Sequence, residues 1–230
     1  MDRAEFDKFA DEYAAMHGKS IRASGEGPEF FAEYKVRDVA GYISGIGLSA
    51  GSMLDFGSGI GGSVPYIKKY LPNFQLSCVD VSERSLDIAR GRFPGAAQYL
   101  QFDGASLPFG GNTFDLVFTA CVFHHIPAGE HVALLTEIRR VMKPDGIFFI
   151  FEHNPLNPLT VRVMNQCPFD ENAVLIRADQ LKARLLRAGF SECELRYRVF
   201  FPRFLRHLRR LEAGLAWLPA GAQYYLAARQ

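Results

Sequence analysis

The feature that most constrains this chain is a glycine-rich segment directly after a short apolar run. Residues 53–62 read Met-Leu-Asp-Phe-Gly-Ser-Gly-Ile-Gly-Gly. Glycine allows a tight turn and a close approach of a ligand to the backbone, and a helix that follows presents free N–H groups at its start. A strand, a glycine turn and a helix in this order predict a site for a nucleotide-containing cofactor. With Asp80 downstream, Gly57-x-Gly59-x-x-Gly62 also fits the dinucleotide-binding pattern.

Four further segments distinguish between the possible cofactors, because they follow in a fixed order. They read Gln-Phe-Asp-Gly-Ala-Ser-Leu-Pro-Phe at 101–109, Thr-Phe-Asp-Leu-Val-Phe-Thr at 113–119, His-His-Ile at 124–126 and Arg-Val-Met-Lys-Pro-Asp-Gly-Ile at 140–147. Together with the glycine-rich segment they resemble the class I S-adenosylmethionine-dependent methyltransferases over about residues 50–152. The resemblance is to the small-molecule branch that includes ubiquinone and menaquinone C-methyltransferases, and it implies S-adenosyl-L-methionine as the cofactor.

Apolar runs alternate with amphipathic stretches along the chain. The predicted strands lie near residues 52–57, 74–81, 97–103, 114–121, 146–152, 193–200 and 223–228. The predicted helices lie near 63–71, 83–92, 129–142, 179–188 and 203–217, with two more ahead of the first strand. Such alternation predicts an α/β fold with a parallel sheet. The resemblance implies a Rossmann-like, mostly parallel seven-stranded sheet in the order 3-2-1-4-5-7-6, with helices on both faces and an N-terminal helical cap.

The size of the chain limits the number of domains. A length of 230 residues with 48% hydrophobic content suits one well-buried α/β domain. We therefore expect a single methyltransferase domain over residues 1–230. Within it we expect a helical cap or lid at 1–48, a cofactor-binding core at 50–152, and a substrate-side loop with a C-terminal hairpin at 153–230.

Composition argues against several other classes of protein. The formal net charge of +1 gives no global attraction to nucleic acid or to anionic membranes. The four cysteines form no Cys-x-x-Cys pair, so neither a zinc knuckle nor a disulfide framework is indicated. The N-terminus lacks the apolar core of a signal peptide, and no apolar run approaches the ~20 residues of a membrane span. We expect a cytoplasmic protein without a transmembrane segment; no pattern indicates its oligomeric state.

Three acidic residues are candidates for the cofactor site. Asp80 ends the second strand, where its carboxylate can accept both ribose hydroxyls; alternatively, it is a partner for the start of the helix near Ser82. Asp103 with Gly104 resembles the pair that holds the adenine ring in the family, or Asp103 simply forms a turn. We expect Asp55 to orient backbone N–H groups near the methionine end of the cofactor.

The other residues expected to contact the cofactor belong to the same loops. They are Gly57 and Gly59 in the glycine turn, Ser58 between them, Val81 after the second strand and Ala120 at the end of the fourth.

Two segments are expected to close over the site as a mobile lid. The N-terminal segment to about Pro28 carries Phe6, Phe9 and Tyr13 at helical spacing. Residues 154–177 form an irregular stretch of a length that is usually functional. Closure would exclude water from the methyl group, and Tyr13 would add a hydroxyl to the cofactor carboxylate. The alternative is that the first helix only covers an apolar edge of the sheet.

Candidate bases lie at the carboxyl ends of strands four and five, where open α/β sheets bind ligands. They are His124, His125 and His153, with Glu152 beside the last. Histidine suits proton transfer near neutral pH, although each could instead be a structural residue. Adjacent histidines in an extended segment point in opposite directions, so at most one of the first two should face the pocket. Imidazole and carboxylate also suit zinc or iron, but no ligand spacing favours a metal and we expect none.

A basic stretch near the C-terminus could grip an anionic or lipid-linked acceptor, or be a solvated face. Its basic residues are Arg203, Arg206, His207, Arg209 and Arg210.

These patterns predict S-adenosylmethionine-dependent methyl transfer to oxygen or carbon of a small, partly apolar acceptor. The alternatives are a nicotinamide- or flavin-dependent oxidoreductase and a catalytically silent S-adenosylmethionine-binding protein. A nucleic-acid amino-methyltransferase is disfavoured because its Asn/Asp-Pro-Pro-aromatic segment after strand four is absent; residues 119–123 read Thr-Ala-Cys-Val-Phe.

Overall fold

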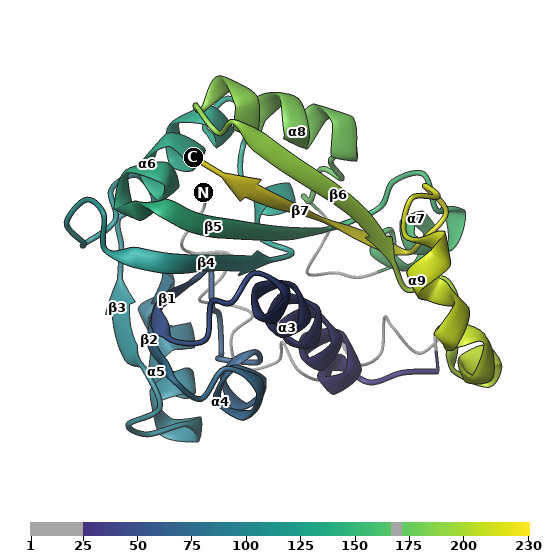
Figure 1. Ribbon diagram of the computed structural model, residues 1–230, viewed down its shortest axis with the longest axis horizontal. Helices are drawn as coiled ribbons and strands as arrows, with labels where there is room; N and C mark the ends of the chain where they lie inside the picture. The colour runs from purple at the N-terminus through teal and green to yellow at the C-terminus, as the bar shows by residue number, and fades with distance from the viewer. Residues whose placement is uncertain (1–24, 167–171) are drawn as a thin grey trace.

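A computed structural model describes residues 25–166 and 172–230, which fold around a central seven-stranded sheet (Figure 1). The strands lie in the order β3-β2-β1-β4-β5-β7-β6, which confirms the predicted order. β7 runs antiparallel to β5 and β6, and the other neighbours are parallel. The strands are β1 (Gly51–Phe56), β2 (Phe74–Asp80), β3 (Gln98–Gln101), β4 (Phe114–Ala120), β5 (Met142–His153), β6 (Glu192–Arg198) and β7 (Gln223–Arg229).

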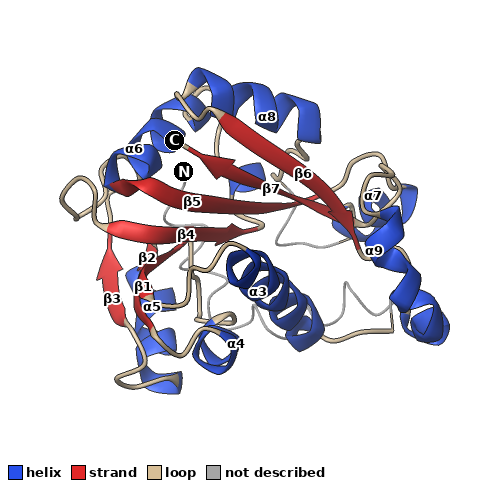
Figure 2. Cartoon of the chain, viewed as in Figure 1, coloured by secondary structure: helices blue, strands red, loops and turns tan. Residues whose placement is uncertain are grey.

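Helices cover both faces of the sheet (Figure 2). The described helices are α3 (Pro28–Gly45), α4 (Val64–Tyr70), α5 (Glu83–Arg92), α6 (His131–Val141), α7 (Pro158–Met164), α8 (Ala178–Arg187) and α9 (Glu212–Leu215), with 3-10 turns η2 (Phe123–His125) and η4 (Arg203–Leu211). Helices α3, α4 and α5 pack on the face that carries Met53 and Phe149, and α6 and α8 on the face that carries Leu54 and Phe148. Successive strand residues point to opposite faces, so each strand serves both cores.

The central strands read as continuous apolar runs because neither face meets water. In β5, four consecutive side chains are fully buried, namely Phe148, Phe149, Ile150 and Phe151. Chemistry is therefore confined to the ends of the strands, where the chain leaves the sheet.

The segment after β5 differs from the prediction. Residues 154–177 were expected to be irregular, yet α7 begins at Pro158. The side chain of Asn157 caps this helix by accepting from the backbone N–H groups of Leu159 and Thr160. Asparagine followed by proline is a typical helix start, so the pair marks a helix rather than a loop.

The C-terminal helical stretch predicted at 203–217 is also different in detail. It is a 3-10 turn over η4 that continues into the short helix α9.

The N-terminal cap is described only in part. Helix α3 is present and packs against α4. Phe6, Phe9 and Tyr13 lie outside the described residues, so the predicted lid role of the segment before Pro28 stays a prediction. No helix in the described part of the chain combines the length and the apolarity needed to cross a membrane.

Candidate active site

A cavity of about 1070 Å³ lies at the carboxyl edge of the parallel strands. Its wall includes Gly57 and Gly59 after β1, Val81 after β2, Cys121 after β4 and His153 at the end of β5. This edge is where open α/β sheets bind ligands, because the loops there diverge around the switch in strand order.

The glycine turn forms one end of this cavity. Gly57 and Gly59 have φ angles of +73° and +51°, which L-residues with a side chain rarely adopt. A Cβ on Gly57 would lie 2.5 Å from a methyl carbon of Val122. At Gly59 a Cβ would meet nothing within 4 Å, so its absence leaves backbone open to the cavity. The N–H groups of Gly57 and Ser58 both donate to the carbonyl of Val79, which fixes the turn to β2.

Asp80 links this turn to the next helix. Its Oδ2 accepts from the N–H of Gly59 at 2.8 Å, and its Oδ1 accepts from the N–H of Ser82 at 2.9 Å. Ser82 in turn caps α5 by accepting from the N–H of Ser85. The alternative role as a partner for the helix start is therefore present. Asp80 also lines the cavity, and its binding to the ribose stays a prediction.

Asp55 is a buried carboxylate beside the glycine turn. Its residue is 2% exposed and lines the cavity, and its Oδ2 has no hydrogen-bond partner in the part of the chain that the structure describes. No described backbone N–H donates to that oxygen, and the expected role of Asp55 in orienting N–H groups stays a prediction. Burial, aided by repulsion from Asp80, raises the pKa of Asp55 to about 7. An orphan acidic oxygen at this place suits a cationic ligand group.

Asp103 and Gly104 do not line the cavity, although the neighbouring Phe102 does. Asp103 is exposed, and its Oδ1 accepts from the N–H groups of Ala105 and Ser106. These two hydrogen bonds lower the pKa of Asp103. The structure thus places Asp103 in a turn-forming role, and its contact with adenine stays a prediction.

The remaining predicted cofactor contacts are distributed as follows. Ser58, Val81 and Ala120 line the cavity, whereas Tyr13 is outside the described residues.

The histidines are arranged differently from the prediction. His124 and His125 lie in the 3-10 turn η2, not in an extended segment, and both line the cavity. A 3-10 turn rotates successive residues by about 120° instead of 180°, so neighbours can face the same side. Their ring centroids are 4.2 Å apart, and that of His153 lies 5.3 Å from His124. Among the described residues, no group of three or more His, Cys, Asp or Glu side chains is arranged to hold a metal ion.

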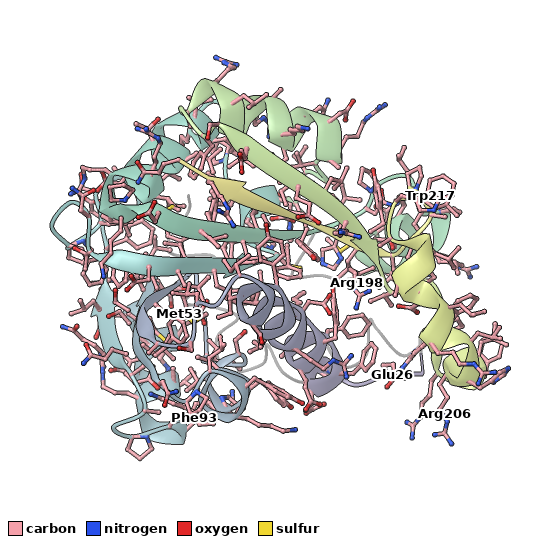
Figure 3. The ribbon with its side chains drawn as sticks, viewed as in Figure 1. Glu26, Met53, Phe93, Arg198, Arg206 and Trp217 are labelled. Atoms are coloured by element: carbon pink, nitrogen blue, oxygen red, sulfur yellow. The ribbon has the colours of Figure 1, made fainter. Side chains whose placement is uncertain are left out.

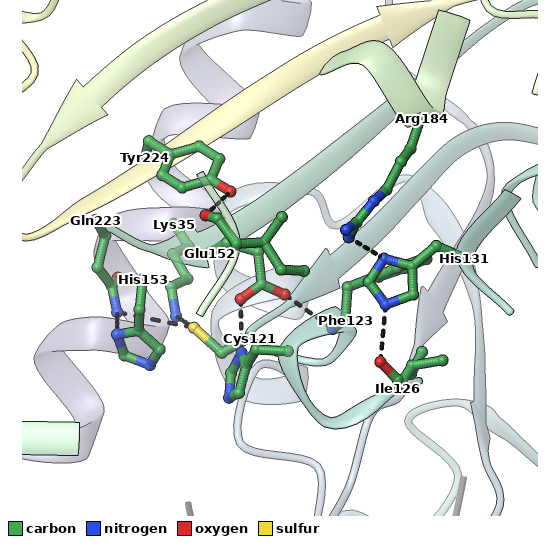
Figure 4. Close-up of polar contacts among 12 residues, drawn as sticks. Lys35, Cys121, Phe123, Ile126, His131, Glu152, His153, Arg184, Gln223 and Tyr224 are labelled. Atoms are coloured by element: carbon green, nitrogen blue, oxygen red, sulfur yellow. Dashed lines mark hydrogen bonds and ion pairs between the residues drawn. The ribbon is translucent and has the colours of Figure 1, made fainter. Parts of the chain in front are cut away.

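Glu152 and His124 form a buried pair, of which His124 lines the cavity. Nδ1 of His124 lies 2.6 Å from Oε2 of Glu152, and both side chains are 1% exposed. Oε1 of Glu152 accepts from the N–H of Phe123 at 2.8 Å (Figure 4). Burial alone would raise the pKa of Glu152, but attraction to His124 and the hydrogen bond from it lower the pKa. An ionised Glu152 favours the tautomer of His124 that carries its proton on Nδ1 and leaves Nε2 as the basic nitrogen.

A second polar network lies on the same wall and was missed from the sequence. Nζ of Lys35 lies 3.2 Å from Sγ of Cys121, and Nε2 of Gln223 lies 3.2 Å from Nδ1 of His153. The hydroxyl of Tyr34 donates to Oε1 of Gln223. One signal was available: Phe31, Lys35 and Val39 share an i, i+4 stripe, so a lysine interrupts the apolar face of a helix.

The basic stretch is partly anchored to the start of α3. Arg209 forms an ion pair with Glu26 at 2.9 Å and lies over the ring of Phe30, and Arg203 donates to the carbonyl of Gly25. Arg206 extends away from the sheet at the outer end of η4 (Figure 3).

Comparison with known proteins decides the class of the chain. Residues 54–150 match a family described as a methyltransferase domain. The malonyl-[acyl-carrier protein] O-methyltransferase of Geobacter sulfurreducens is 27% identical over 191 residues, which is 76% of this chain and 71% of that protein. This chain therefore carries a methyltransferase domain and is similar to S-adenosylmethionine-dependent methyltransferases. The demethylmenaquinone methyltransferase of Thermotoga maritima is 30% identical over 105 residues, and the match spans 46% of this methyltransferase and 44% of that one.

The fold agrees with this assignment. A solved S-adenosylmethionine-dependent methyltransferase of Thermotoga maritima, described as a possible histamine N-methyltransferase, covers 99% of both chains with a TM-score of 0.69 at 18% identity. The predicted resemblance and cofactor are confirmed, and the oxidoreductase alternative is set aside.

The residues of the methyltransferase fit its cofactor. S-adenosyl-L-methionine carries a cationic sulfonium and an ammonium group, and the orphan carboxylate oxygen of Asp55 suits such a charge. The open backbone at Gly59 allows close approach, and the carboxylate of Asp80 lies at the same end of the cavity.

Proposed function

We propose that this methyltransferase acts on oxygen or carbon of a small, partly apolar acceptor. The observation that carries the proposal is that His124, buried against Glu152, lines the same cavity as the glycine turn. When bound, S-adenosylmethionine supplies a methyl group on a sulfonium that is already a good leaving group. The chain therefore has to position the acceptor, exclude water and, for some acceptors, remove a proton.

The size of the cavity supports a shared site. Ligand pockets commonly measure about 300 to 1000 Å³, and the cavity of about 1070 Å³ is slightly larger than that range. It thus has room for a nucleotide-sized cofactor together with a second small molecule.

The part of the wall away from the glycine turn supports a partly apolar acceptor. Its apolar lining residues come from α7, from the loop after β6 and from η4, and they are Leu159, Val163, Met164, Val199, Phe200 and Phe204. Phe204 is 77% exposed, so it lies at the rim and can contact both cavity and solvent.

The Glu152–His124 pair supports an acceptor that has to lose a proton. In our proposal Nε2 of His124 takes the proton of a hydroxyl, or of an acidic carbon, as methyl transfer proceeds. Glu152 stabilises the resulting imidazolium at 2.6 Å but does not line the cavity, so it acts through His124. A neutral amine already offers a lone pair and needs no base before transfer, which is why we favour oxygen or carbon.

The names of relatives point the same way. One is a malonyl-[acyl-carrier protein] O-methyltransferase and another a demethylmenaquinone methyltransferase.

The proposal is tested by measuring S-adenosylhomocysteine formation with a panel of phenols, quinols, carboxylic acids and matched amines. We expect turnover with at least one hydroxyl or acidic-carbon acceptor. Cofactor binding without turnover of any acceptor would favour the catalytically silent alternative, and turnover of amines alone would contradict the choice of oxygen or carbon.

A further inference from the structure

The cavity wall holds a buried cation for which the described part of the chain offers no carboxylate partner. Lys35 is 6% exposed and lines the cavity from α3. Its hydrogen bond to Sγ of Cys121 is to a thiol, and no carboxylate of residues 25–166 or 172–230 forms an ion pair with it. A buried ammonium group is costly unless a negative charge compensates it. Within the described residues, the anion for Lys35 is therefore Cys121 in its thiolate form, or it comes from a ligand.

The polar side chains around Lys35 form a network that can bind a ligand. Four residues of the network line the cavity, namely Lys35 of α3, Cys121 directly after β4, His153 of β5 and Gln223 of β7 (Figure 4). Tyr34 fixes the amide of Gln223, which in turn contacts the ring of His153. The amide nitrogen of Gln223 contacts Sγ of Cys121 at 3.7 Å and Nδ1 of His153 at 3.2 Å, so it holds the network together. Lys35 and the other ring nitrogen of His153 are left as donors, which suits the cluster to binding an oxyanion.

When no ligand is bound, Cys121 supplies the negative charge opposite Lys35. Burial would raise the pKa of its thiol, but attraction to His153 and Lys35 outweighs burial and lowers the pKa to about 7. The φ angle of Cys121 is +60°, an uncommon value for a residue other than glycine. The thiol can therefore compensate Lys35 as a thiolate when the site is empty, and become neutral when another anion arrives.

We propose that Lys35, together with His153, which Gln223 holds in place, binds an anionic group of the methyl acceptor, either a carboxylate or an ionised hydroxyl. The inference rests on the proposed methyl transfer and names the class of its acceptor.

The position of the network favours the acceptor over the cofactor carboxylate. In the sheet, β5 lies two strands and β7 three strands from β1, which leads into the glycine turn. At a spacing of about 4.8 Å per strand, His153 and Gln223 lie about 10 and 14 Å across the sheet from that turn. An anion shared by these residues therefore belongs to the half of the cavity that the acceptor occupies.

Calorimetry of the protein saturated with S-adenosylhomocysteine tests the proposal. The probes are octanoate and benzoate, each compared with its uncharged amide. We expect at least one acid to bind about tenfold or more tightly than its amide, the scale of one charge-assisted hydrogen bond. Equal affinity of acid and amide in both pairs, or no binding of either acid, would overturn the proposal.

Variants assign the preference to Lys35. K35M should abolish the preference for the acid, whereas K182M, which removes an exposed lysine on α8, should leave it unchanged. C121S keeps the lysine and should also retain the preference, which separates loss of the cation from a general disturbance of the network.

The binding of S-adenosylhomocysteine itself separates the two possible sources of the anion. K35M should leave that affinity unchanged; a large loss would mean that Lys35 holds the cofactor carboxylate and would overturn the assignment to the acceptor. A preference for acids without any methyl transfer would support this anion site and contradict the proposed function. Turnover limited to uncharged acceptors would support the proposed function and contradict the anion site.

Discussion

Nδ1 of His124 and Oε2 of Glu152 lie 2.6 Å apart, and both side chains are almost completely excluded from solvent. The pair joins the turn after β4 to the end of β5, 28 residues apart in sequence. A histidine held in this way has one defined tautomer and faces the cavity in a fixed orientation. It is therefore the base candidate that the structure positions best.

The first prediction concerns this pair. H124Q should lower turnover on the order of 100-fold or more, because proton removal at the acceptor is lost. E152Q should also lower turnover, through misorientation of the imidazole. Calorimetry with S-adenosylhomocysteine should show retained cofactor affinity in both variants. H207Q, at an exposed histidine of η4, is the matched control, and full activity of H124Q would leave positioning as the main catalytic device.

The second prediction concerns Asp80. D80A should weaken cofactor binding by about 1.5 to 3 kcal/mol, the scale of a hydrogen bond to a charged group. Because Asp80 also accepts from Gly59 and Ser82, D80N is the milder companion, and both variants should be checked for folding by circular dichroism. D145A, at an exposed site, serves as the control. Unchanged affinity in the folded D80A protein would mean that the ribose lies elsewhere.

The third prediction concerns the effect of Asp55 on stability. Burial raises the pKa of Asp55 from 3.8 to about 7 in the folded protein. The folded state thus binds this proton more tightly than the unfolded state, so stability is lost as the pH rises from about 4 to above 7. D55N removes this dependence. Urea unfolding should show D55N gaining stability over the natural protein between pH 5 and pH 8, on the order of 2 kcal/mol. If the stability difference between D55N and the natural protein did not change with pH, the pKa of Asp55 would be the same in the folded and unfolded states.

The fourth prediction concerns the reactivity of Cys121. With a pKa of about 7, its thiol should react with iodoacetamide at neutral pH, and peptide mass mapping follows the rate. His153 and Lys35 lower this pKa while Glu152 raises it, so K35M should shift the pH profile upward by about one unit. Cys78 is a buried internal control, since burial raises its pKa far above neutral. An identical profile in K35M would show that the lysine does not influence the thiol.

The strands and the cofactor turn could be predicted because their signals are local. Apolar runs separated by helical stretches identify a parallel sheet, and glycines after β1 mark a turn that needs positive φ angles. The sequence signal for the helix at Pro158 is also local, but the Asn-Pro pair that starts this helix is equally typical of a loop.

The acceptor side of the cavity could not be predicted, because its contacts join distant parts of the chain. Lys35 and Cys121 are 86 residues apart, and Tyr34 and Gln223 are 189 apart. Within its own segment, none of these residues belongs to a sequence pattern that indicates its contact. The shared direction of His124 and His125 depended on a 3-10 turn, for which the sequence His-His-Ile carries no distinct signal.

The most direct test of the account is to locate the transferred methyl group. The protein is incubated with S-adenosylmethionine carrying a ¹³C-labelled methyl group and with the acceptor panel, and products are analysed by mass spectrometry and NMR. The account predicts a labelled methyl on oxygen or carbon of an acidic acceptor, formed by the natural protein and by H207Q but strongly reduced in H124Q. A label found only on nitrogen, or equal labelling by H124Q, would contradict it.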